Sequence, residues 1–408
     1  MLSLKSPLLA ILIILSLQSS YSFSQVNVFV TTKGVKIIDP DGKELLLKGI
    51  NLGNWLEPEG YMFKFQKAES SRKIYEVYNE IIGPDASTKF WEEFRKNYIT
   101  ENDIKFIKDI GFNSVRIPFD YKLLVHEDFS ANCDPPGYKL LDDVIKWCTK
   151  YKIYAILDMH CAPGGQTGAN IDDSWGYPYL YENTESQNLA VKIWKDLADR
   201  YKNEPYVLGY DLLNEPIAPY FDTEKLNAML EPLYIKITNA IRTVDKNHIV
   251  ILGGAQWNQN FNIFSKPFDP KLIYTFHVYW SDTTQSVIQK YVDFRDKYNV
   301  PMWLGESGEN TMQWIASFRR LLEENDIGWC FWPFKRLDTD RCIVSINQPD
   351  GYEKIIEYAN SSRQVFGDIK NALLKAGNVT KTISEYLNNI RISNCKVNTE
   401  YINALGLK

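Results

Sequence analysis

The sequence predicts an α/β chain that folds as a (β/α)8 TIM barrel with an N-terminal β-hairpin. The first observation behind this prediction is an alternation of short, apolar, β-rich runs with longer segments of helical periodicity. The second is that there are eight such runs, apolar on both faces, as strands of a parallel sheet covered by helices must be. The third is that the chain has neither a G-x-G-x-x-G loop after a strand nor a Walker loop, which disfavours an open doubly wound sheet.

The predicted elements alternate as strand and helix, which implies parallel pairing with right-handed crossovers. The predicted strands are residues 45–51, 112–118, 153–159, 206–213, 249–254, 272–278, 301–306 and 327–332. The predicted helices lie within residues 88–110, begin near residues 140, 188, 226, 286 and 312, and end with one helix over 352–359 or 366–376. Before the first strand, residues 28–45 predict a hairpin that turns at Asp39-Pro40-Asp41-Gly42 and plugs the bottom of the barrel.

Composition excludes several classes of partner. The chain has 408 residues, 45% of them hydrophobic, which is enough for a large core. Its net charge of -5 gives no basic footprint for nucleic acid and no polybasic patch for a membrane surface. Aromatic residues make up 14% of the chain, which fits either a well-packed core or a cleft lined by flat rings that suit the apolar faces of sugars.

The N-terminus has the pattern of a secretory signal peptide over residues 1–24. Lys5 supplies positive charge, residues 7–17 form an apolar run too short to span a bilayer, and small Ser22 and Ser24 flank Phe23. Cleavage after Ser24 leaves residues 25–408, which we expect to form a single catalytic domain that is secreted into an extracellular or periplasmic space.

Cysteine usage agrees with an exported chain. The chain has six cysteines, namely Cys133, Cys148, Cys161, Cys330, Cys342 and Cys395. Their even number and an oxidising route permit disulfides, although the chain is too long for a dense disulfide framework. Cys330 lies inside the apolar run IGWCFW and is predicted to be a buried free thiol.

Polar side chains follow the carboxyl ends of six predicted strands. These residues are Arg116, His160, Asn214, Glu215, His277, Tyr279, Glu306 and Trp332. Because the carboxyl ends of barrel strands meet on one rim, we expect all of them to converge there. His277 and Tyr279 alternate in phase, so both should point to the same side of their strand.

Several of these residues also fit a purely structural role when taken singly. Arg116 fits an ion pair with Asp158 or Glu306, and His160 fits a satisfied core histidine. The two glutamates are harder to explain in this way, because an unpaired carboxylate at the end of a buried strand is costly. Two acids that flank one bond suit glycoside hydrolysis, provided that their environments separate their pKa values.

With these residues in order, the chain resembles glycoside hydrolase family 5, a cellulase-type family of retaining (β/α)8 glycosidases, from about residue 45 to residue 332. The resemblance implies that Glu215 is the acid/base and Glu306 the nucleophile. It also implies that Asn214 binds the sugar 2-hydroxyl and that Tyr279 and Arg116 hold Glu306. The remaining residues implied to surround the −1 sugar are His160, His277 and Trp332.

Two segments are similar to the exo-β-1,3-glucanase branch of that family, namely DMHCAPGGQTG (158–168) and NLGNWLEPEG (51–60). Cys161, Gly165 and an insert over residues 171–183 depart from the branch, so the bond linkage and the exo or endo mode stay open. The alternatives are an endo-β-1,4-glucanase or a β-mannanase of the same family. The candidate sugar platforms on loops, for which plain packing is an equal alternative, are Trp175, Tyr177, Trp257 and Trp280.

Two further classes of protein are weighed against the glycosidase. A metal hydrolase would use Asp158, His160 and His277, but the sequence has no HExxH motif, and neither of its two other histidines follows a predicted strand end to complete a zinc site. A non-catalytic carbohydrate-binding barrel is disfavoured because both glutamates and their polar neighbours are present. We therefore expect a monomer without cofactor or metal whose partner is a β-linked polysaccharide or oligosaccharide.

Overall fold

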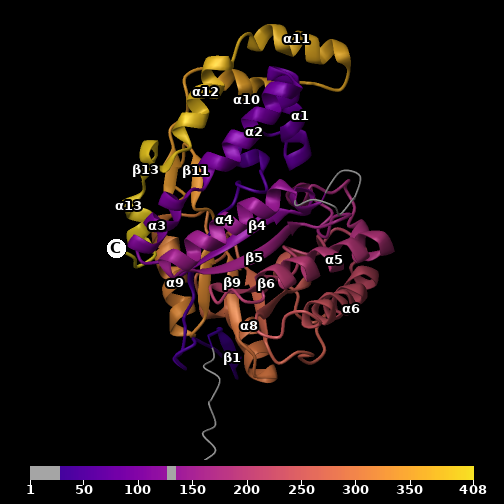
Figure 1. Ribbon diagram of the computed structural model, residues 1–408, viewed down its shortest axis with the longest axis vertical. Helices are drawn as coiled ribbons and strands as arrows, with labels where there is room; N and C mark the ends of the chain where they lie inside the picture. The colour runs from indigo at the N-terminus through magenta and orange to yellow at the C-terminus, as the bar shows by residue number, and fades with distance from the viewer. Residues whose placement is uncertain (1–27, 126–134) are drawn as a thin grey trace, which may run out of the picture.

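The computed structural model describes residues 28–125 and 135–408, and the predicted signal peptide and Cys133 lie outside this part of the chain. The described chain forms a closed barrel of eight parallel strands with helices around it (Figure 1). In chain order the strands are β3 (Lys48–Asn51), β4 (Ser114–Asp120), β5 (Tyr154–Cys161), β6 (Val207–Asp211), β7 (Ile249–Gly253), β8 (Leu272–His277), β9 (Met302–Glu306) and β10 (Gly328–Phe331). The predicted (β/α)8 barrel is confirmed, and each strand lies within or close to its predicted run.

The strands form because their residues are buried on both faces. Every residue of β4, β6, β7, β8, β9 and β10 is buried in the structure. The inner face is filled by apolar side chains from different strands, among them Ile156, Leu208, Ile251, Ile273 and Trp303. β10 pairs with both β3 and β9, which closes the barrel and leaves no free edge.

Six helices of ordinary length cover the barrel. They are α3 (Glu101–Asp109), α4 (Pro136–Tyr151), α5 (Thr184–Tyr201), α6 (Thr223–Arg242), α8 (Gln285–Tyr298) and α9 (Met312–Glu324). Between β7 and β8 the chain forms only α7 (Ala255–Asn258), a single turn whose Gln256 and Trp257 have positive φ angles.

The segments proposed for the last helix lie elsewhere in the molecule. Both exist, as α10 (Glu353–Asn360) and α11 (Phe366–Ala376), but they join α1 (Ser71–Ile82), α2 (Pro84–Tyr98) and α12 (Thr380–Asn389) in a helical layer beside the barrel (Figure 1). The helix that packs beside α9 is α13 (Thr399–Ala404), and the chain end then reaches the end of α3, where Lys408 N donates to Ile110 O. An amphipathic pattern predicts a helix but does not say which surface will cover it.

The N-terminal hairpin is confirmed, and the predicted turn at Asp39 to Gly42 is present as the second of two turns, with Ile38 paired antiparallel to Glu44 across it. Its strands are β1 (Thr31–Lys33) and β2 (Lys36–Ile38), so the chain turns at Gly34-Val35, where Gly34 has a φ angle of +57°. Asp39 to Gly42 forms a second turn, closed by a hydrogen bond from Gly42 N to Asp39 O. Two turns lie close together in this segment. Asp39-Pro40-Asp41-Gly42 is the stronger turn motif in the sequence, but it follows the turn at Gly34-Val35 that joins β1 to β2.

The hairpin closes the amino-terminal end of the barrel. Val30 and Ile37 from the hairpin and Leu47 just before β3 pack in one cluster with the barrel interior. The prediction that the hairpin plugs the bottom of the barrel is therefore confirmed. Below the active end, the barrel is a packed core and not a channel.

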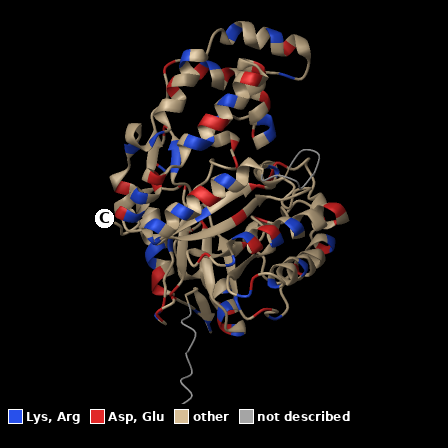
Figure 2. Ribbon diagram, in the orientation of Figure 1, with Lys and Arg blue, Asp and Glu red and all other residues tan. Residues whose placement is uncertain are grey.

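The described cysteines are free thiols, and charged residues of both signs are spread over the helices (Figure 2). Cys148, Cys161, Cys330, Cys342 and Cys395 are free, and Cys330 is buried as predicted. In the view of Figure 2, Lys and Arg residues are interspersed with Asp and Glu residues along the helices of the barrel and of the layer. Within the described residues, no helix combines the length and the apolar character that a membrane crossing requires.

Candidate active site

Arg116 lies on β4 at the centre of the barrel mouth and is fully buried. Its guanidinium forms ion pairs with Asp158 at 2.9 Å, Asp211 at 2.8 Å and Glu306 at 2.5 Å. Burial lowers the pKa of Arg116, but the three carboxylates outweigh this effect and the net shift is upward. Arg116 therefore pairs structurally with buried acids and also contacts a predicted catalytic acid. Arg116 thus has both the structural role and the site role that the sequence allowed for it.

Asn214 and His160 hold each other in one orientation. Arg116 Nη2 donates to Asn214 Oδ1 at 2.9 Å, and Asn214 Nδ2 lies 3.1 Å from His160 Nε2. His160 Nδ1 lies 2.8 Å from Asp158 Oδ2, so the ring donates to Asp158 and accepts from Asn214. Burial lowers the pKa of His160 to about 4, which keeps the imidazole neutral near neutral pH. His160 takes one hydrogen of the Asn214 amide, so the second hydrogen is free for another acceptor.

Glu215 directly follows Asn214 beyond the end of β6. Its φ angle is +45°, a left-handed conformation that turns its side chain away from the strand direction. Gln166 Nε2 donates to Asn214 O at 2.8 Å, and Thr167 Oγ1 donates to Glu215 O at 2.8 Å, which fixes the strained turn. Burial raises the pKa of Glu215 to about 7. This carboxyl is therefore suited to carry a proton near neutral pH.

Glu306, at the end of β9, has a different environment from Glu215. It accepts from Arg116 Nη1 at 2.5 Å and from the Tyr279 hydroxyl at 3.1 Å, and both of these donors stabilise its anion. His277 Nδ1 lies 2.9 Å from Glu215 Oε1 and 3.6 Å from Glu306 Oε2. His277 and Tyr279 thus face the same side, as predicted from their spacing. One carboxylate oxygen of Glu215, one ring nitrogen of His277 and one carboxylate oxygen of Glu306 lie within 4.8 Å of one another.

Trp332 closes one wall of the site. Its ring stacks on His160 with a centroid distance of 5.6 Å and an interplanar angle of 15°. Its Nε1 donates to the Tyr61 hydroxyl at 2.6 Å. A Cβ atom at Gly53 would lie 2.3 Å from this ring, so glycine is required there for the ring to sit in place. All eight predicted strand-end residues therefore lie in one connected site.

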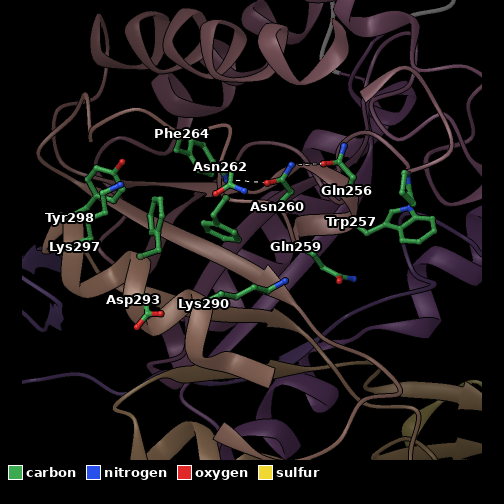
Figure 3. Close-up of a pocket in the computed structure, with 13 residues that line it drawn as sticks. Gln256, Trp257, Gln259, Asn260, Asn262, Phe264, Lys290, Asp293, Lys297 and Tyr298 are labelled. Atoms are coloured by element: carbon green, nitrogen blue, oxygen red, sulfur yellow. Dashed lines mark hydrogen bonds between the residues drawn. The ribbon is translucent and has the colours of Figure 1, made fainter. Parts of the chain in front are cut away.

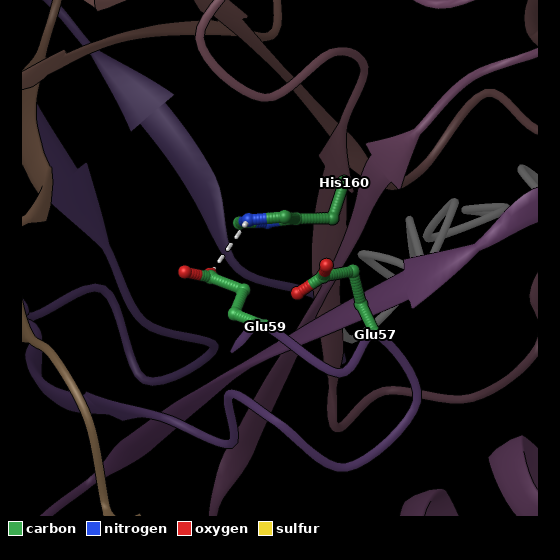
Figure 4. A group of neighbouring side chains, drawn as sticks. All are labelled: Glu57, Glu59 and His160. Atoms are coloured by element: carbon green, nitrogen blue, oxygen red, sulfur yellow. Dashed lines mark ion pairs between the residues drawn. The ribbon is translucent and has the colours of Figure 1, made fainter. Parts of the chain in front are cut away.

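Two acids of this wall were missed by the sequence interpretation. Glu57 and Glu59 lie in the loop after β3 and are buried beside His160, with Glu59 Oε1 at 3.8 Å from His160 Nε2 (Figure 4). Burial and the neighbouring carboxylates raise the pKa of both groups well above the usual range. The segment NLGNWLEPEG carries both acids, but they lie six and eight residues beyond the end of the first predicted strand and not at the strand end itself.

The four loop aromatics do not all reach the site. The Trp280 ring is exposed and lies 5.5 Å from the ring of Tyr279. Trp175 contacts α1, where the Arg72 guanidinium lies 3.6 Å from its ring, and the other two contact a neighbouring loop: Tyr177 packs on Phe221, and Trp257 lies near Tyr220.

The donor set of the metal hypothesis is not assembled. His160 uses its two ring nitrogens toward Asp158 and Asn214, whereas His277 faces the two glutamates. In the described ranges, the donor triplets that converge within 4.8 Å are Glu57-Glu59-His160 and Glu215-His277-Glu306. The trio of Asp158, His160 and His277, which the metal alternative would use, is not one of them.

Comparison with known proteins decides the family. Residues 76–337 match the model of "Cellulase (glycosyl hydrolase family 5)". The chain belongs to glycoside hydrolase family 5. It is therefore a glycoside hydrolase that acts on β-glucans or related glycosides, and the resemblance stated from the sequence is confirmed.

The names of relatives of this hydrolase describe several different activities. It is 32% identical over 237 residues to a "Beta-xylosidase" of Phanerodontia chrysosporium, covering 58% of this chain and 48% of that protein. It is 26% identical over 352 residues to "Endoglucanase C" of Acetivibrio thermocellus, covering 71% and 91%. It is 28% identical over 231 residues to "Glucan 1,3-beta-glucosidase 2" of Wickerhamomyces anomalus, covering 53% and 52%. The chain thus spans about half the length of the first and third of these relatives.

Solved structures agree on the fold. A rutinosidase from Aspergillus niger superposes with a TM-score of 0.59 at 19% identity, covering 73% of this chain and 92% of that one.

Proposed function

We propose that the hydrolase cleaves β-glucan or β-glucoside bonds with retention of configuration, with Glu306 as nucleophile and Glu215 as acid/base. The observation that carries this proposal is the contrast between two neighbouring carboxyls. Glu306 is held by Arg116 and Tyr279, whereas burial raises the pKa of Glu215 to about 7. Oxygen atoms of the two groups lie within 4.8 Å, which supports the retaining spacing of about 5–5.5 Å over the inverting one of about 6.5–9.5 Å.

The reaction takes two displacements. In the first, a Glu306 oxygen attacks the anomeric carbon while Glu215 donates its proton to the leaving oxygen, which forms a glycosyl ester and a free alcohol. In the second, Glu215 takes a proton from water, the water oxygen attacks the anomeric carbon, and the Glu306 carboxylate leaves. The free hydrogen of the Asn214 amide is directed at the sugar 2-hydroxyl, a contact that strengthens in the transition state.

For the substrate we propose exo action on β-1,3-glucan. The similarity of residues 51–60 and 158–168 to the exo-β-1,3-glucanase branch supports it, as does the relative named glucan 1,3-beta-glucosidase. The insert 171–183, which departs from that branch, is tied to the wall of the site. Asp173 Oδ1 accepts from Arg72 N at 3.1 Å, and the neighbouring Ser71 Oγ lies 3.4 Å from Glu57 Oε1.

The second candidate is endo action on β-1,4-glucan. It is favoured by one observation, namely that the match to the endoglucanase covers more of both chains than the match to the glucosidase does. We also propose that the enzyme is exported, on the basis of the signal-peptide pattern in residues 1–24. We propose separately that it works as a monomer.

The test is an early product analysis on β-1,3-glucan, β-1,4-glucan, mixed-linkage glucan and mannan, with Glu306→Gln as the inactive control. Glucose as the sole early product from β-1,3-glucan supports exo action. A ladder of oligomers from β-1,4-glucan or mannan would leave the catalytic roles standing and overturn the proposed substrate. Hydrolysis by Glu306→Gln within a few-fold of the wild-type rate would overturn the catalytic roles themselves.

A further inference from the structure

A cavity of about 860 Å³ lies between the helical layer and the barrel. Residues of α1 and α2 line it from the layer, residues of α4 line it from the barrel, and Trp55 from the loop after β3 also contributes. Its volume falls in the range of about 300–1,000 Å³ that small-molecule sites occupy. None of the catalytic residues described above lines it. The cavity is therefore a candidate binding site separate from the active site.

Two buried polar groups that line the cavity lack a hydrogen-bond partner. Trp91 is 5% exposed and Ser87 is 1% exposed, and within the described residues neither Trp91 Nε1 nor Ser87 Oγ has a partner. A buried polar group without a partner is costly, and native structures keep few of them. The indole nitrogen can only donate, whereas the serine hydroxyl can both donate and accept. A ligand that carries hydroxyl groups would satisfy both.

Aromatic rings line the cavity from the layer and from the barrel. Tyr75 of α1 and Trp91 of α2 pack edge to face with their centroids 4.6 Å apart, and Trp147 of α4 lines the cavity from the barrel side. Tyr75 and Trp147 are only partly buried, so part of each side chain is open to a ligand. Flat rings of this kind suit the apolar faces of sugars.

The charged residues of the lining favour a neutral ligand. They are of both signs, namely Glu92, Arg95, Lys96, Lys139 and Asp143. Lys139 Nζ lies 2.8 Å from Asp143 Oδ2, and Lys96 Nζ lies 3.4 Å from Glu93 Oε1. An anion or a cation would therefore meet like charges as well as opposite ones. A neutral ring with several hydroxyl groups matches the rings, the unpartnered groups and the balanced charge together.

A second groove, of about 700 Å³, lies on the other side of the barrel, between residues 256–264 and α8 (Figure 3). Some of its amides already have partners: Asn260 Nδ2 donates to Gln256 Oε1 at 2.8 Å, and Gln256 Nε2 donates to Asn227 Oδ1 of α6 at 2.8 Å. Of the buried polar atoms that lack a partner in the described residues, none belongs to the lining of this groove. Unpartnered buried groups therefore distinguish the cavity between α2 and α4 from the groove beside α8.

We propose that the cavity between α2 and α4 is a second carbohydrate site, which binds a short stretch of β-glucan outside the barrel mouth. The choice of ligand rests on the proposed function, because it takes the same polymer. Trp55 connects the cavity to the active site. Its Nε1 donates to Arg95 O of α2 at 2.7 Å, and its loop carries Glu57 and Glu59, of which Glu59 lies 3.8 Å from His160. A glucan bound in the cavity would keep the polymer beside the loop that forms a wall of the active site.

The test is a calorimetric titration of the Glu306→Gln enzyme with a β-1,3-linked glucopentaose. Two sites per molecule are expected, one in the barrel mouth and one in the cavity. In the same background, Trp147→Ala should weaken binding at one of the two sites about threefold to tenfold, because it removes a ring from the cavity. Asn79→Ala combined with Thr88→Ala should also weaken that site. Asn79 and Thr88 are exposed, so the double variant decides the question if Trp147→Ala does not fold.

The matched control is Phe366→Ala in the Glu306→Gln background. Phe366 is 82% exposed on α11 and does not line the cavity, so its removal should leave both sites unchanged. A second site that is weakened in the cavity variants and unchanged in this control supports the proposal. A single site in the Glu306→Gln enzyme, or two sites that the cavity variants leave unchanged, would overturn it.

The outcomes separate this inference from the proposed function. If the wild-type enzyme hydrolyses β-1,3-glucan and the titration shows no cavity site, the cavity proposal is overturned and the proposed function stands. If the wild-type enzyme hydrolyses neither a β-glucan nor an aryl β-glucoside, the proposed function falls, and the same titration still decides the cavity. Binding that the cavity variants weaken would then support a carbohydrate site there, and no bound pentasaccharide would overturn it.

Discussion

At the scale of single residues, the two glutamates of the site differ in the side chains that surround them. Arg116 donates a hydrogen bond to Glu306 and brings a positive charge next to it. Glu215 itself has a left-handed backbone conformation, and its carboxyl lies beside the neutral ring of His277. Burial lowers the pKa of His277 to about 3, so this ring adds no positive charge that would ionise Glu215. Burial therefore favours a protonated Glu215 near neutral pH, while Arg116 and Tyr279 donate hydrogen bonds to Glu306.

Glu215→Gln should affect substrates according to their leaving groups. Without a proton donor, hydrolysis of a glucan or an alkyl glucoside should fall about 10²–10⁴-fold. An aryl glucoside with a strongly acidic phenol needs little protonation of its leaving oxygen, so formation of its glycosyl ester should fall much less. Burst kinetics on both substrates measure the difference, and equal losses on both would contradict the acid role.

The pH dependence should have an alkaline limb set by Glu215. Burial raises the pKa of Glu215 to about 7, and the proposed acid must carry its proton in the free enzyme. The kcat/KM for a glucan should therefore fall as pH rises through about 7, since deprotonation removes the donor. Glu215→Gln with an activated aryl glucoside should lack this limb. A limb that persists unchanged in the variant would assign it to another group.

Much of the catalytic site could be predicted from sequence at this scale, because each polar residue ends an apolar run. Arg116, His160 and Glu306 were found in this way, and the structure places them in one site. Glu57 and Glu59 were missed since they lie several residues beyond the first strand, where a loop folds back on the site. The fold of a long loop depends on contacts distant in sequence, which local patterns do not specify.

At the scale of elements, strands were easier to predict than the helix that follows the last strand. Strands buried on both faces are apolar throughout, and few other structures produce short runs of this kind. The C-terminal segments are amphipathic helices, and any of them could cover the barrel by pattern alone. α13, the one that packs against α9, has only six residues and was not predicted.

Leu405→Ala tests the structural role of the segment that ends α13. Leu405 is fully buried at the chain end that packs against α9 and α3, so its truncation should lower the free energy of unfolding by about 2–5 kcal/mol. Activity of the folded enzyme should not change, since none of the residues of the site belongs to this segment. Asn403→Ala, at an exposed position of α13, is the control for thermal melting. Equal melting temperatures for both variants would show that the segment does not stabilise the barrel.

At the scale of the whole molecule, the barrel and the helical layer are joined by a buried charge. Lys335 is fully buried, and its Nζ donates to Asp103 at 2.7 Å, to Tyr98 O at 2.6 Å and to Ile390 O at 2.9 Å. These partners belong to α3, to the end of α2 and to the residue after α12, so one ammonium group ties three helices together. The layer also supplies α1, whose first turn contacts both the insert 171–183 and Glu57. The layer is thus positioned to shape the wall of the active site.

The most direct measurement of the central claim is the capture of the covalent intermediate. A 2-deoxy-2-fluoro-β-glucoside with an activated leaving group slows both steps by destabilising the oxocarbenium-like transition state, and the good leaving group lets the ester accumulate. Mass spectrometry of the intact enzyme followed by peptide mapping should find one added fluoroglucosyl group, on Glu306. A label on any other residue, or turnover of the same compound with inversion and no label, would contradict the assignment of Glu306 as the nucleophile.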